Sequence, residues 1–484
     1  MHPDRKNHDV RAARLRLVAI VVLAAVLRVI FLGARSFWGD EIVSVKLAMG
    51  DWHGFTYWIL RREANMALYY LALKGWVRFG DGEAWVRLFS AVFGILSIAA
   101  IYVLARRLQG ERTAWIVALV TATNACAVQF SQEARSYSLL MFLVVLSYYY
   151  FIRTLEEESL WPAALYAVVS ACALYTHFFA ALIIFAQLAS LLWLPSKELP
   201  VRRLAAAYFA IAIAAIPIGA YILRNDVGQL YWVQPVTAAE VYKLFIFFAG
   251  ASKAVAAVLS VLSLVLCALA VVTFSTKLRQ RSEESWRFGL VLSWAVVPPL
   301  VAVLVSLHKP VFVHRYLLIS LPGYLLLVAL GLGRLKRKAL VATLIVVVAL
   351  SGVSIAQGYF RPVEDWRGAV DYVLKDSQPG DALLVYIPYG TNNFNFYARR
   401  LERTEKHPPF TYLDSMMGVS HVAAVNSPRI WLVLYPSPHV AELAPQFESA
   451  LAMRYRSEQR RDFKGVSVIL FSGLKPPSSL PQAK

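Results

Sequence analysis

The sequence predicts an all-α polytopic membrane protein with about eleven transmembrane helices and a small C-terminal α/β domain. Of the 484 residues, 58% are hydrophobic and the mean hydropathy is +0.54, whereas soluble proteins are about 45–50% apolar. Apolar runs near the roughly 20 residues that one crossing needs recur between residues 17 and 358. Beyond residue 358 the composition becomes that of a soluble domain.

The distribution of charge reports membrane topology. Lys and Arg number 49 against 30 Asp and Glu, but the basic residues lie mostly in short runs between apolar segments, as cytoplasmic loops do. This pattern excludes a nucleic-acid-binding surface as the reason for the basic charge. The cysteines all lie within apolar segments, which argues against a disulfide framework: Cys126, Cys172 and Cys267.

The N-terminal residues 1–16 are rich in Arg and Lys and precede the first apolar run, 17–33, so we expect them in the cytoplasm. A cleaved signal peptide ending near Gly33 is the alternative. Arg28 argues against it, because it interrupts an apolar region that is already overlong for a signal peptide. In both cases the segment around Asp40 lies outside.

The long first outer loop, residues 34–83, contains an amphipathic pattern. Apolar residues at 55, 58 and 59 precede Arg61 and Arg62, which predicts a helix lying in the membrane interface. Residues 66–79 are short for a span and include Lys74. If residues 66–79 did cross the membrane, every later loop would lie on the opposite side from the one predicted here.

Ten further spans are expected before the soluble domain. The weakest boundary is Tyr175–Phe178, which offers hardly any loop, so a kinked pair or a re-entrant turn is the alternative there. An odd total places the C-terminal domain on the same outer side as Asp40. The expected spans are near 84–105, 114–130, 136–152, 162–176, 178–194, 204–222, 252–275, 288–306, 316–333 and 339–357.

Residues 359–474 read as a soluble α/β domain. Asp365 is expected to cap a helix over 366–374, and Pro379–Asp381 to form a turn. No catalytic motif is evident in this domain, and the Pro- and Ser-rich tail 475–484 is expected to be disordered. Buried strands are predicted at 383–387, 430–435 and 466–471.

The first candidate for chemistry is the acidic pair Asp40 and Glu41, directly after the first span. A carboxylate at the edge of hydrocarbon is costly to desolvate and is usually kept for a ligand, a proton or a catalytic step. A solvated turn at Gly39 and Asp40 is the alternative reading.

The other candidates lie in predicted outer loops. Glu133, Arg135 and Tyr137 share a very short loop, where helix capping or mutual pairing is the alternative to function. His177 lies at the outer end of the fifth span, 162–176, and could instead be a hydrogen-bonded interfacial residue. The loop 308–316 concentrates cationic and titratable groups where the positive-inside rule expects few, so it could hold a phosphate or snorkel to headgroups: Lys309, His314, Arg315 and Tyr316.

Six short motifs follow one another along the chain: Trp38-Gly39-Asp40-Glu41, Leu68-Tyr69-Tyr70, Trp85-Val86-Arg87-Leu88, Gln132-Glu133-Ala134-Arg135-Ser136-Tyr137, Tyr175-Thr176-His177 and Arg315-Tyr316-Leu317. This ordered set resembles the GT-C glycosyltransferases, in particular the bacterial branch of the protein O-mannosyltransferase and aminoarabinose transferase type (glycosyltransferase 39-like). The resemblance covers roughly residues 15–360. It implies a multispanning helical GT-C module that uses a polyprenyl-phosphate sugar and inverts the anomeric carbon.

The resemblance also suggests roles for the candidates. Asp40 matches the proposed general base, and Glu41 and Glu133 would orient the acceptor or Asp40. No metal is required, although a divalent cation held by Asp40 and Glu133 is the alternative. The chain departs from its relatives at Asn65-Met66-Ala67, where they often carry His-Pro or Pro-Pro. Arg135, Lys309 and Arg315 would hold the donor phosphate, with Tyr137, His177, His314 and Tyr316 lining the substrate.

The leading hypothesis is therefore sugar transfer at the outer face of a bacterial inner membrane. The partners would be the bilayer, a polyprenyl-phosphate-linked sugar donor and an acceptor that is a lipid, a glycan or a protein. A transporter or flippase for a lipid-linked sugar would also need intramembrane charges, but no repeated halves are evident. A structural assembly subunit is the third hypothesis, and it predicts that loss of Asp40 is tolerated.

Overall fold

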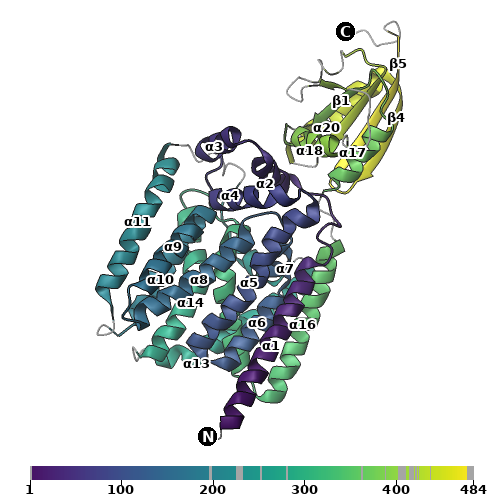
Figure 1. Cartoon of the computed structure of the whole chain (residues 1–484). Helices are drawn as coiled ribbons and strands as arrows, with labels where there is room; N and C mark the ends of the chain where they lie inside the picture. Colours follow the sequence, from purple (N-terminus) through teal and green to yellow (C-terminus); the bar gives the residue numbers. More distant parts are fainter. Residues whose placement is uncertain are drawn as a thin grey trace. The chain divides into compact units, whose positions relative to one another are not determined.

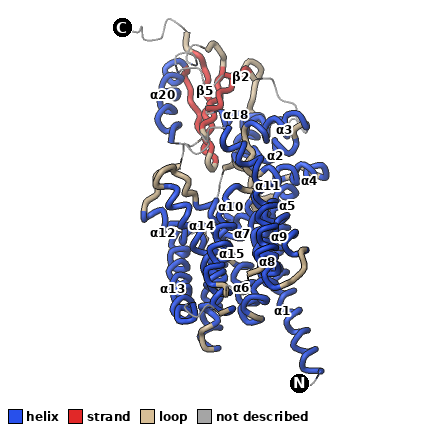
Figure 2. Tube along the Cα trace, turned by 90° about the vertical axis from the view of Figure 1, so that its left-hand side faces the viewer, coloured by secondary structure: helices blue, strands red, loops and turns tan. Residues whose placement is uncertain are grey.

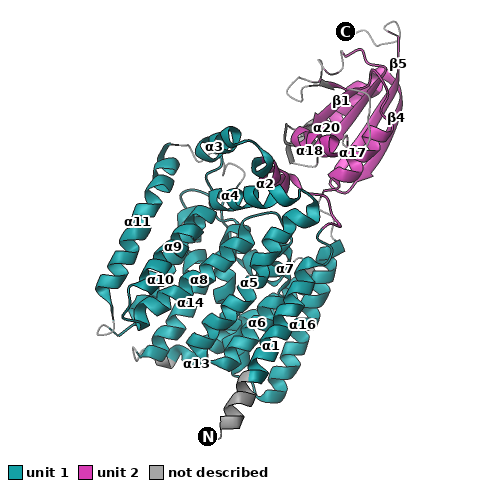
Figure 3. Ribbon diagram, viewed as in Figure 1, with its two compact units in different colours: residues 1–32, 47–360 teal, residues 33–46, 361–484 magenta. Residues whose placement is uncertain are grey.

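The computed structural model describes residues 3–195, 199–224, 233–250, 253–278, 282–360, 364–386, 388–401, 410–413, 419, 422, 425–435 and 438–476. The chain forms two compact units (Figure 3). The membrane unit comprises residues 1–32 and 47–360, and the C-terminal unit comprises residues 33–46 and 361–484. The segment that carries Asp40 therefore groups with the C-terminal unit, whereas the sequence boundaries had assigned it to the membrane module. The expected disordered tail falls, from residue 477 on, outside the described residues.

Every segment expected to span the membrane contains a helix (Figures 1 and 2). Among the described residues, seven helices are long and apolar enough to cross a membrane, or eight if one bent pair counts as a span. Two of the other expected spans, 162–176 and 178–194, form shorter apolar helices. The first expected span lies in α1, whose several arginines make that helix less apolar. The helices are α1 (Pro3–Val29), α5 (Glu83–Gln109), α6 (Glu111–Thr123) with α7 (Ala125–Ser131), α8 (Tyr137–Glu156), α9 (Trp161–Thr176), α10 (Ala181–Ser190), α11 (Val201–Arg224), α13 (Lys253–Leu278), α14 (Glu283–Ser306), α15 (Leu321–Gly333) and α16 (Arg337–Phe360).

The core of the membrane unit is α15, which together with the preceding 3-10 helix His314–Ser320 forms a span that is 89% buried. Its sequence is apolar all round, as expected for a helix enclosed by other helices. Gly331 lets α15 approach α13 closely, because a Cβ there would collide with the backbone carbonyl of Leu266.

A buried arginine organises the broken span formed by α6 and α7. The two helices bend by 60°, and Asn124 caps α7 by accepting a hydrogen bond from the Ala127 N–H at 2.8 Å. The carbonyls left at the end of α6 accept hydrogen bonds from Arg28 of α1, at 2.9 Å for Ala122 and 3.2 Å for Thr121. This bend brings the chain to the loop that contains Glu133 and Arg135.

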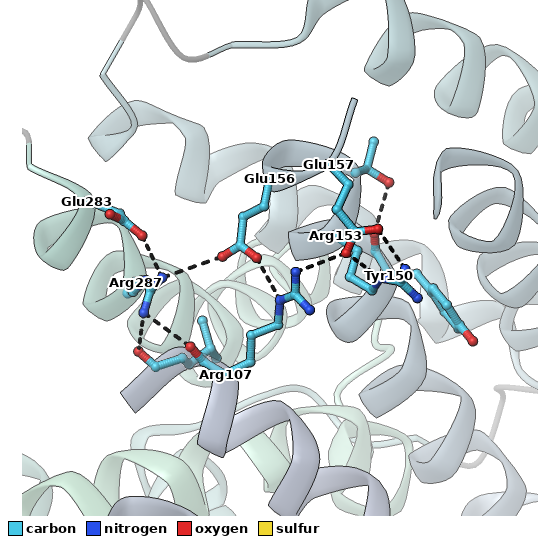
Figure 4. Close-up of polar contacts among 9 residues, drawn as sticks. Arg107, Tyr150, Arg153, Glu156, Glu157, Glu283 and Arg287 are labelled. Atoms are coloured by element: carbon cyan, nitrogen blue, oxygen red, sulfur yellow. Dashed lines mark hydrogen bonds and ion pairs between the residues drawn. The ribbon is translucent and has the colours of Figure 1, made fainter. Parts of the chain in front are cut away.

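The end of α5, the end of α8 and the start of α14 are joined by salt bridges that we call the ion-pair network (Figure 4). Arg107 pairs with Glu156 at 2.6 Å and with Glu157 at 3.0 Å. Arg287 pairs with Glu156 at 3.5 Å and also donates to the carbonyl of Arg107 at 3.1 Å. Three helix ends are thereby fixed to one another. The network comprises Arg107, Arg153, Glu156, Glu157, Glu283 and Arg287.

The first outer loop is helical in most of its length. It contains α2 (Gly39–Met49), α3 (Trp52–Arg61), α4 (Ala67–Trp76) and a 3-10 turn at Val77–Phe79. The amphipathic helix expected in this loop is α3, whose Trp52, Trp58 and Leu60 are exposed. A helix that the sequence reading did not predict, α12 (Ala238–Ala249), follows α11.

The C-terminal unit is a five-stranded sheet with the order β2-β1-β3-β5-β4. β1 is parallel to β2 and β3, and β5 is antiparallel to β3 and β4. Leu384 and Leu432 pack under α20 on one face, and Trp431 meets Tyr372 of α17 on the other. The elements are α17 (Trp366–Lys375), β1 (Ala382–Tyr386), α18 (Pro388–Leu401), β2 (Thr411–Leu413), β3 (Arg429–Leu434), α20 (Pro438–Arg454), β4 (Tyr455–Phe463) and β5 (Val466–Leu474).

The α/β prediction for this domain is confirmed. Asp365 caps α17 by accepting from the Gly368 N–H at 2.9 Å, and Gly380 makes its turn with φ of +91°. The three predicted strands are β1, β3 and β5. Two strands were not predicted: β2, which is only 3 residues long, and β4, whose sequence Tyr455–Phe463 is mostly charged and exposed and shows no apolar alternation.

Candidate functional site

In the membrane unit, hydrogen bonds connect the loop Ser131–Ser136, the end of α1 and the start of α5. Gln132 donates to the Ile30 carbonyl at 2.8 Å and so caps the end of α1. Arg87 donates to the Leu32 carbonyl at 2.8 Å. Ser90 donates to the Arg135 carbonyl at 3.2 Å. Residues that were singled out separately in the sequence therefore build one end of the helix bundle.

Arg135 lies within this end of the bundle. Its side chain is only 7% exposed, and it donates to the Tyr70 hydroxyl at 3.4 Å. Tyr69 meets Ser90 at 3.2 Å, so the Leu-Tyr-Tyr motif supports both the side chain and the backbone of Arg135. Glu133, half-buried, accepts from the Gln129 amide at 3.2 Å.

His177 is 1% exposed and forms the centre of an aromatic cluster. Its ring lies 4.7 Å from that of Tyr316 and 6.2 Å from that of Tyr137, between centroids. Nδ1 accepts from the Phe179 N–H at 3.2 Å. Asn65 lies 3.5 Å from Nε2. The break between α9 and the next helix is therefore built around the histidine, as the short loop at Tyr175–Phe178 had suggested.

Two guanidinium groups act on this cluster. Burial lowers the pKa of His177, and the positive charges of Arg135 and Arg315 lower it further, to about 3. Arg315 is also 5.7 Å from the centroid of the Tyr316 ring. We call Arg135, Tyr137, His177, Arg315 and Tyr316 the His177 cluster. Its cations are held beside aromatic rings, and guanidinium groups in such places suit a phosphate or diphosphate anion.

The loop 308–316 divides into two parts. Lys309 is exposed, on the turn that follows α14. His314 contacts α12 by its Nε2, 2.9 Å from the carbonyl oxygen of Glu240 and 3.5 Å from that residue's carboxylate. Of the loop's four candidates, Arg315 and Tyr316 belong to the His177 cluster, whereas His314 faces Glu240.

Asp40 and Glu41 stand in the first turn of α2, in the C-terminal unit. Glu41 is buried and accepts from the Trp38 N–H at 3.3 Å, which is the return contact of a capping box. Asp40 is half-exposed. An anionic side chain at a helix N-terminus is stabilised by the helix dipole. Glu41 therefore serves as a cap of α2, and Asp40 is the more accessible of the two acids.

The residues suggested for a divalent cation, Asp40 and Glu133, belong to different compact units. Over the described parts of the chain, no group of three or more His, Cys, Asp and Glu side chains is arranged to hold a metal ion. The donor sets within either unit therefore do not form a metal centre by themselves.

Sequence reasoning missed several residues that hold the candidates in place. Asn65 binds the backbone N–H of Phe178 at 3.0 Å as well as lying beside His177. It stands at the position where the chain departs from its relatives, which was the available signal. Glu364 accepts from the Gly39 N–H at 3.0 Å. No sequence pattern pointed to Glu364, because a single acidic residue at the start of a soluble domain is common.

The comparisons with known proteins agree with this architecture. Residues 63–222 match the sequence family described as dolichyl-phosphate-mannose-protein mannosyltransferase. No curated protein matches the chain significantly.

Three solved structures illustrate the likeness in fold. ArnT from Cupriavidus metallidurans in the apo state is 14% identical with a TM-score of 0.59, over 96% of this chain and 100% of that one. ArnT bound to undecaprenyl phosphate is 13% identical with a TM-score of 0.55, over 96% and 99%. The archaeal oligosaccharyltransferase AglB from Archaeoglobus fulgidus, in complex with an inhibitory peptide and a dolichol-phosphate, is 12% identical with a TM-score of 0.52, over 97% and 75%.

These findings confirm the resemblance that the motifs indicated. The chain is a multi-pass membrane protein with a small C-terminal sheet domain. Over residues 63–222 it matches the dolichyl-phosphate-mannose-protein mannosyltransferase family in sequence, and over nearly its whole length it has the GT-C fold.

Proposed function

We propose that the protein is a glycosyltransferase of the bacterial inner membrane. It transfers a sugar from a polyprenyl phosphate to an acceptor hydroxyl at the extracytoplasmic face. The observation that carries the proposal is the His177 cluster, in which Arg135 and Arg315 are brought from distant parts of the sequence to one end of the helix bundle. Support comes from the family match and from the solved relatives bound to undecaprenyl phosphate and dolichol-phosphate.

In this mechanism Arg135 and Arg315 bind the donor phosphate and stabilise the charge that develops on it as the sugar leaves. Asp40 takes the proton of the acceptor hydroxyl, whose oxygen attacks the anomeric carbon. The bond between that carbon and the phosphate oxygen breaks, and its electron pair leaves with the polyprenyl phosphate. A single in-line displacement of this kind inverts the configuration.

The remaining candidates have supporting roles in the proposal. Tyr137, His177 and Tyr316 line the donor site, and the buried position of His177 suits a fixed hydrogen-bonding group. Glu133 orients the acceptor. Lys309 and His314 border the site, Lys309 as an exposed charge that attracts the anionic donor. Glu41 acts through α2, by keeping the first turn formed.

The test is transfer of radiolabelled sugar from a mixed pool of polyprenyl-phosphate sugars, in membranes with matched amounts of wild-type or Asp40→Asn protein. We expect a labelled product with wild type and a loss of about 10²–10⁴-fold in Asp40→Asn, the contribution typical of a general base. The mass of the product identifies the acceptor. Equal labelling by both proteins would remove Asp40 as the base.

Two further arms address the alternatives. EDTA added to the wild-type reaction tests a divalent cation, whose removal would abolish transfer if Asp40 served as a ligand. A flippase would move the lipid-linked sugar across vesicles without making a new glycosidic bond. The anomeric configuration of the product, determined by NMR, tests inversion.

A further inference from the structure

The segment that carries Asp40 is built into the C-terminal unit. The Phe37 N–H donates to the Tyr397 hydroxyl at 2.6 Å, and the Phe37 ring is fully buried, with its centroid 6.0 Å from that of Phe396. Lys46 donates to the Asn392 side chain at 2.6 Å. Residues on both sides of Asp40 are thus anchored to α18, which belongs to the soluble domain.

Glu364 is the centre of this attachment. One carboxylate oxygen accepts from the Gly39 N–H at 3.0 Å and from the Trp366 indole at 2.7 Å. The other accepts from the Tyr435 hydroxyl at 2.9 Å. The backbone carbonyl of Glu364 accepts in addition from the Ser36 hydroxyl. One buried residue, 9% exposed, therefore holds the chain immediately before Asp40 to α17 and to the end of β3.

The electrostatic environment of Glu364 is costly for a purely structural residue. Burial raises the pKa of its carboxyl group, and the nearby negative charge of Asp40 raises it further, against the lowering effect of its hydrogen bonds. Placing one acid beside another inside a domain lowers stability, so such an arrangement points to a role other than stabilisation. Perturbed carboxyl groups of this kind are concentrated at functional sites.

We propose that Glu364 is the positioning residue for Asp40. By binding the Gly39 N–H it fixes the first turn of α2, and with it the direction of the Asp40 carboxylate. The C-terminal unit then holds and orients the proposed base. This inference rests on the proposed function of Asp40.

A side-chain substitution can separate geometry from charge. In Glu364→Gln the amide oxygen can accept from Gly39 and Trp366, while the amide nitrogen donates to the oxygen of Tyr435, so all three contacts persist. In Glu364→Ala all three are lost. Positioning by hydrogen bonds therefore predicts that the Gln variant transfers sugar at close to the wild-type rate and that the Ala variant is slower.

The experiment compares kcat and the donor KM of the full-length protein in membranes. We expect Glu364→Ala to lower kcat about tenfold or more, because small misplacements of a catalytic group are expensive in rate. The donor KM should stay within about twofold and the kcat of Glu364→Gln within about threefold of wild type. Glu448→Ala is the control, since Glu448 is another acid of the same domain that accepts from Arg460 at 3.4 Å.

Hydrogen exchange supplies a readout that does not depend on activity. The backbone amides of residues 39–44 should exchange faster in Glu364→Ala and at the wild-type rate in Glu364→Gln. If Glu364→Ala fails to fold, Glu364→Asp takes its place, because the shorter carboxylate cannot reach all three donors.

The outcomes separate the inference from the function on which it rests. A Glu364→Ala protein as fast as Glu448→Ala, or a Gln variant as slow as the Ala variant, would overturn the positioning role. Wild-type transfer by Asp40→Asn would overturn the assignment of the base, and with it the catalytic part of the inference. Unchanged exchange at residues 39–44 in Glu364→Ala would overturn the anchoring itself.

Discussion

Helix α8 connects two polar regions that are built differently. At its end, Glu156 and Glu157 join the ion-pair network, in which acids and bases from three helices pair at 2.5–3.5 Å. At its start, Tyr137 belongs to the His177 cluster, where two guanidinium groups lie around aromatic rings. In the first region acids pair with bases, whereas in the second two arginines lie near a buried histidine and aromatic rings. The difference separates a structural region from a candidate binding site.

The largest difference between the two regions is expected in the rate of sugar transfer when one arginine of each region is replaced by alanine. Arg315→Ala should lower kcat/KM for sugar transfer by about 10²-fold or more, because it removes a cation that stabilises the leaving phosphate. Arg153→Ala, in the ion-pair network, removes the same charge and should leave transfer within about twofold. Rates measured in parallel on membranes with matched expression check this. An equal loss in both variants would erase the distinction between the two regions.

An intermediate effect is expected on stability alone. Glu156 bridges Arg107 and Arg287, so Glu156→Gln should lower the unfolding free energy by about 1 kcal/mol, the upper range for partly exposed pairs. The melting temperature of the purified protein in detergent reports this change, with transfer activity unchanged. A variant that keeps its melting temperature but loses activity would assign the network to function.

The smallest effect is a dependence on pH. The Arg153 hydrogen bonds lower the pKa of Glu157. A carboxyl group with a lowered folded-state pKa stabilises the fold above its unfolded value of about 4.3, and this contribution is lost as the pH falls through the folded value. Wild type should therefore melt slightly above Glu157→Gln at pH 7, and the gap should close as the pH drops below about 4. A gap that widens on acidification would contradict the sign.

The helices of the membrane unit could be predicted because each apolar run has the length and composition of its element. The candidate site could be predicted only in part. Arg135 and Arg315 are conspicuous as charges in outer loops, and the structure brings both to His177. Asn65 and Glu364 act through contacts with residues 112 and 325 positions away in sequence. Such distant contacts leave no periodic pattern.

The charged region 308–316 shows the same limit at shorter range. Its composition predicted a basic loop, but composition cannot say which way each side chain points. His314 turns to Glu240, on the helix α12 that the reading missed. Without that helix, nothing in the sequence separates the role of His314 from that of Arg315.

The buried arginine of the first helix has a consequence for how the protein is made. Arg28 finds its acceptors on α6, the carbonyls of Thr121 and Ala122, whereas Gln132 caps the end of α1 in return. Neither partner exists when α1 leaves the ribosome, and Arg28, in the last turn of that helix, is a charge that is costly to leave without partners inside a bilayer. The hydrogen bonds of α1 with its partners can therefore form only after about 100 more residues have been translated. Its stable integration into the bilayer is coupled to the arrival of the broken span.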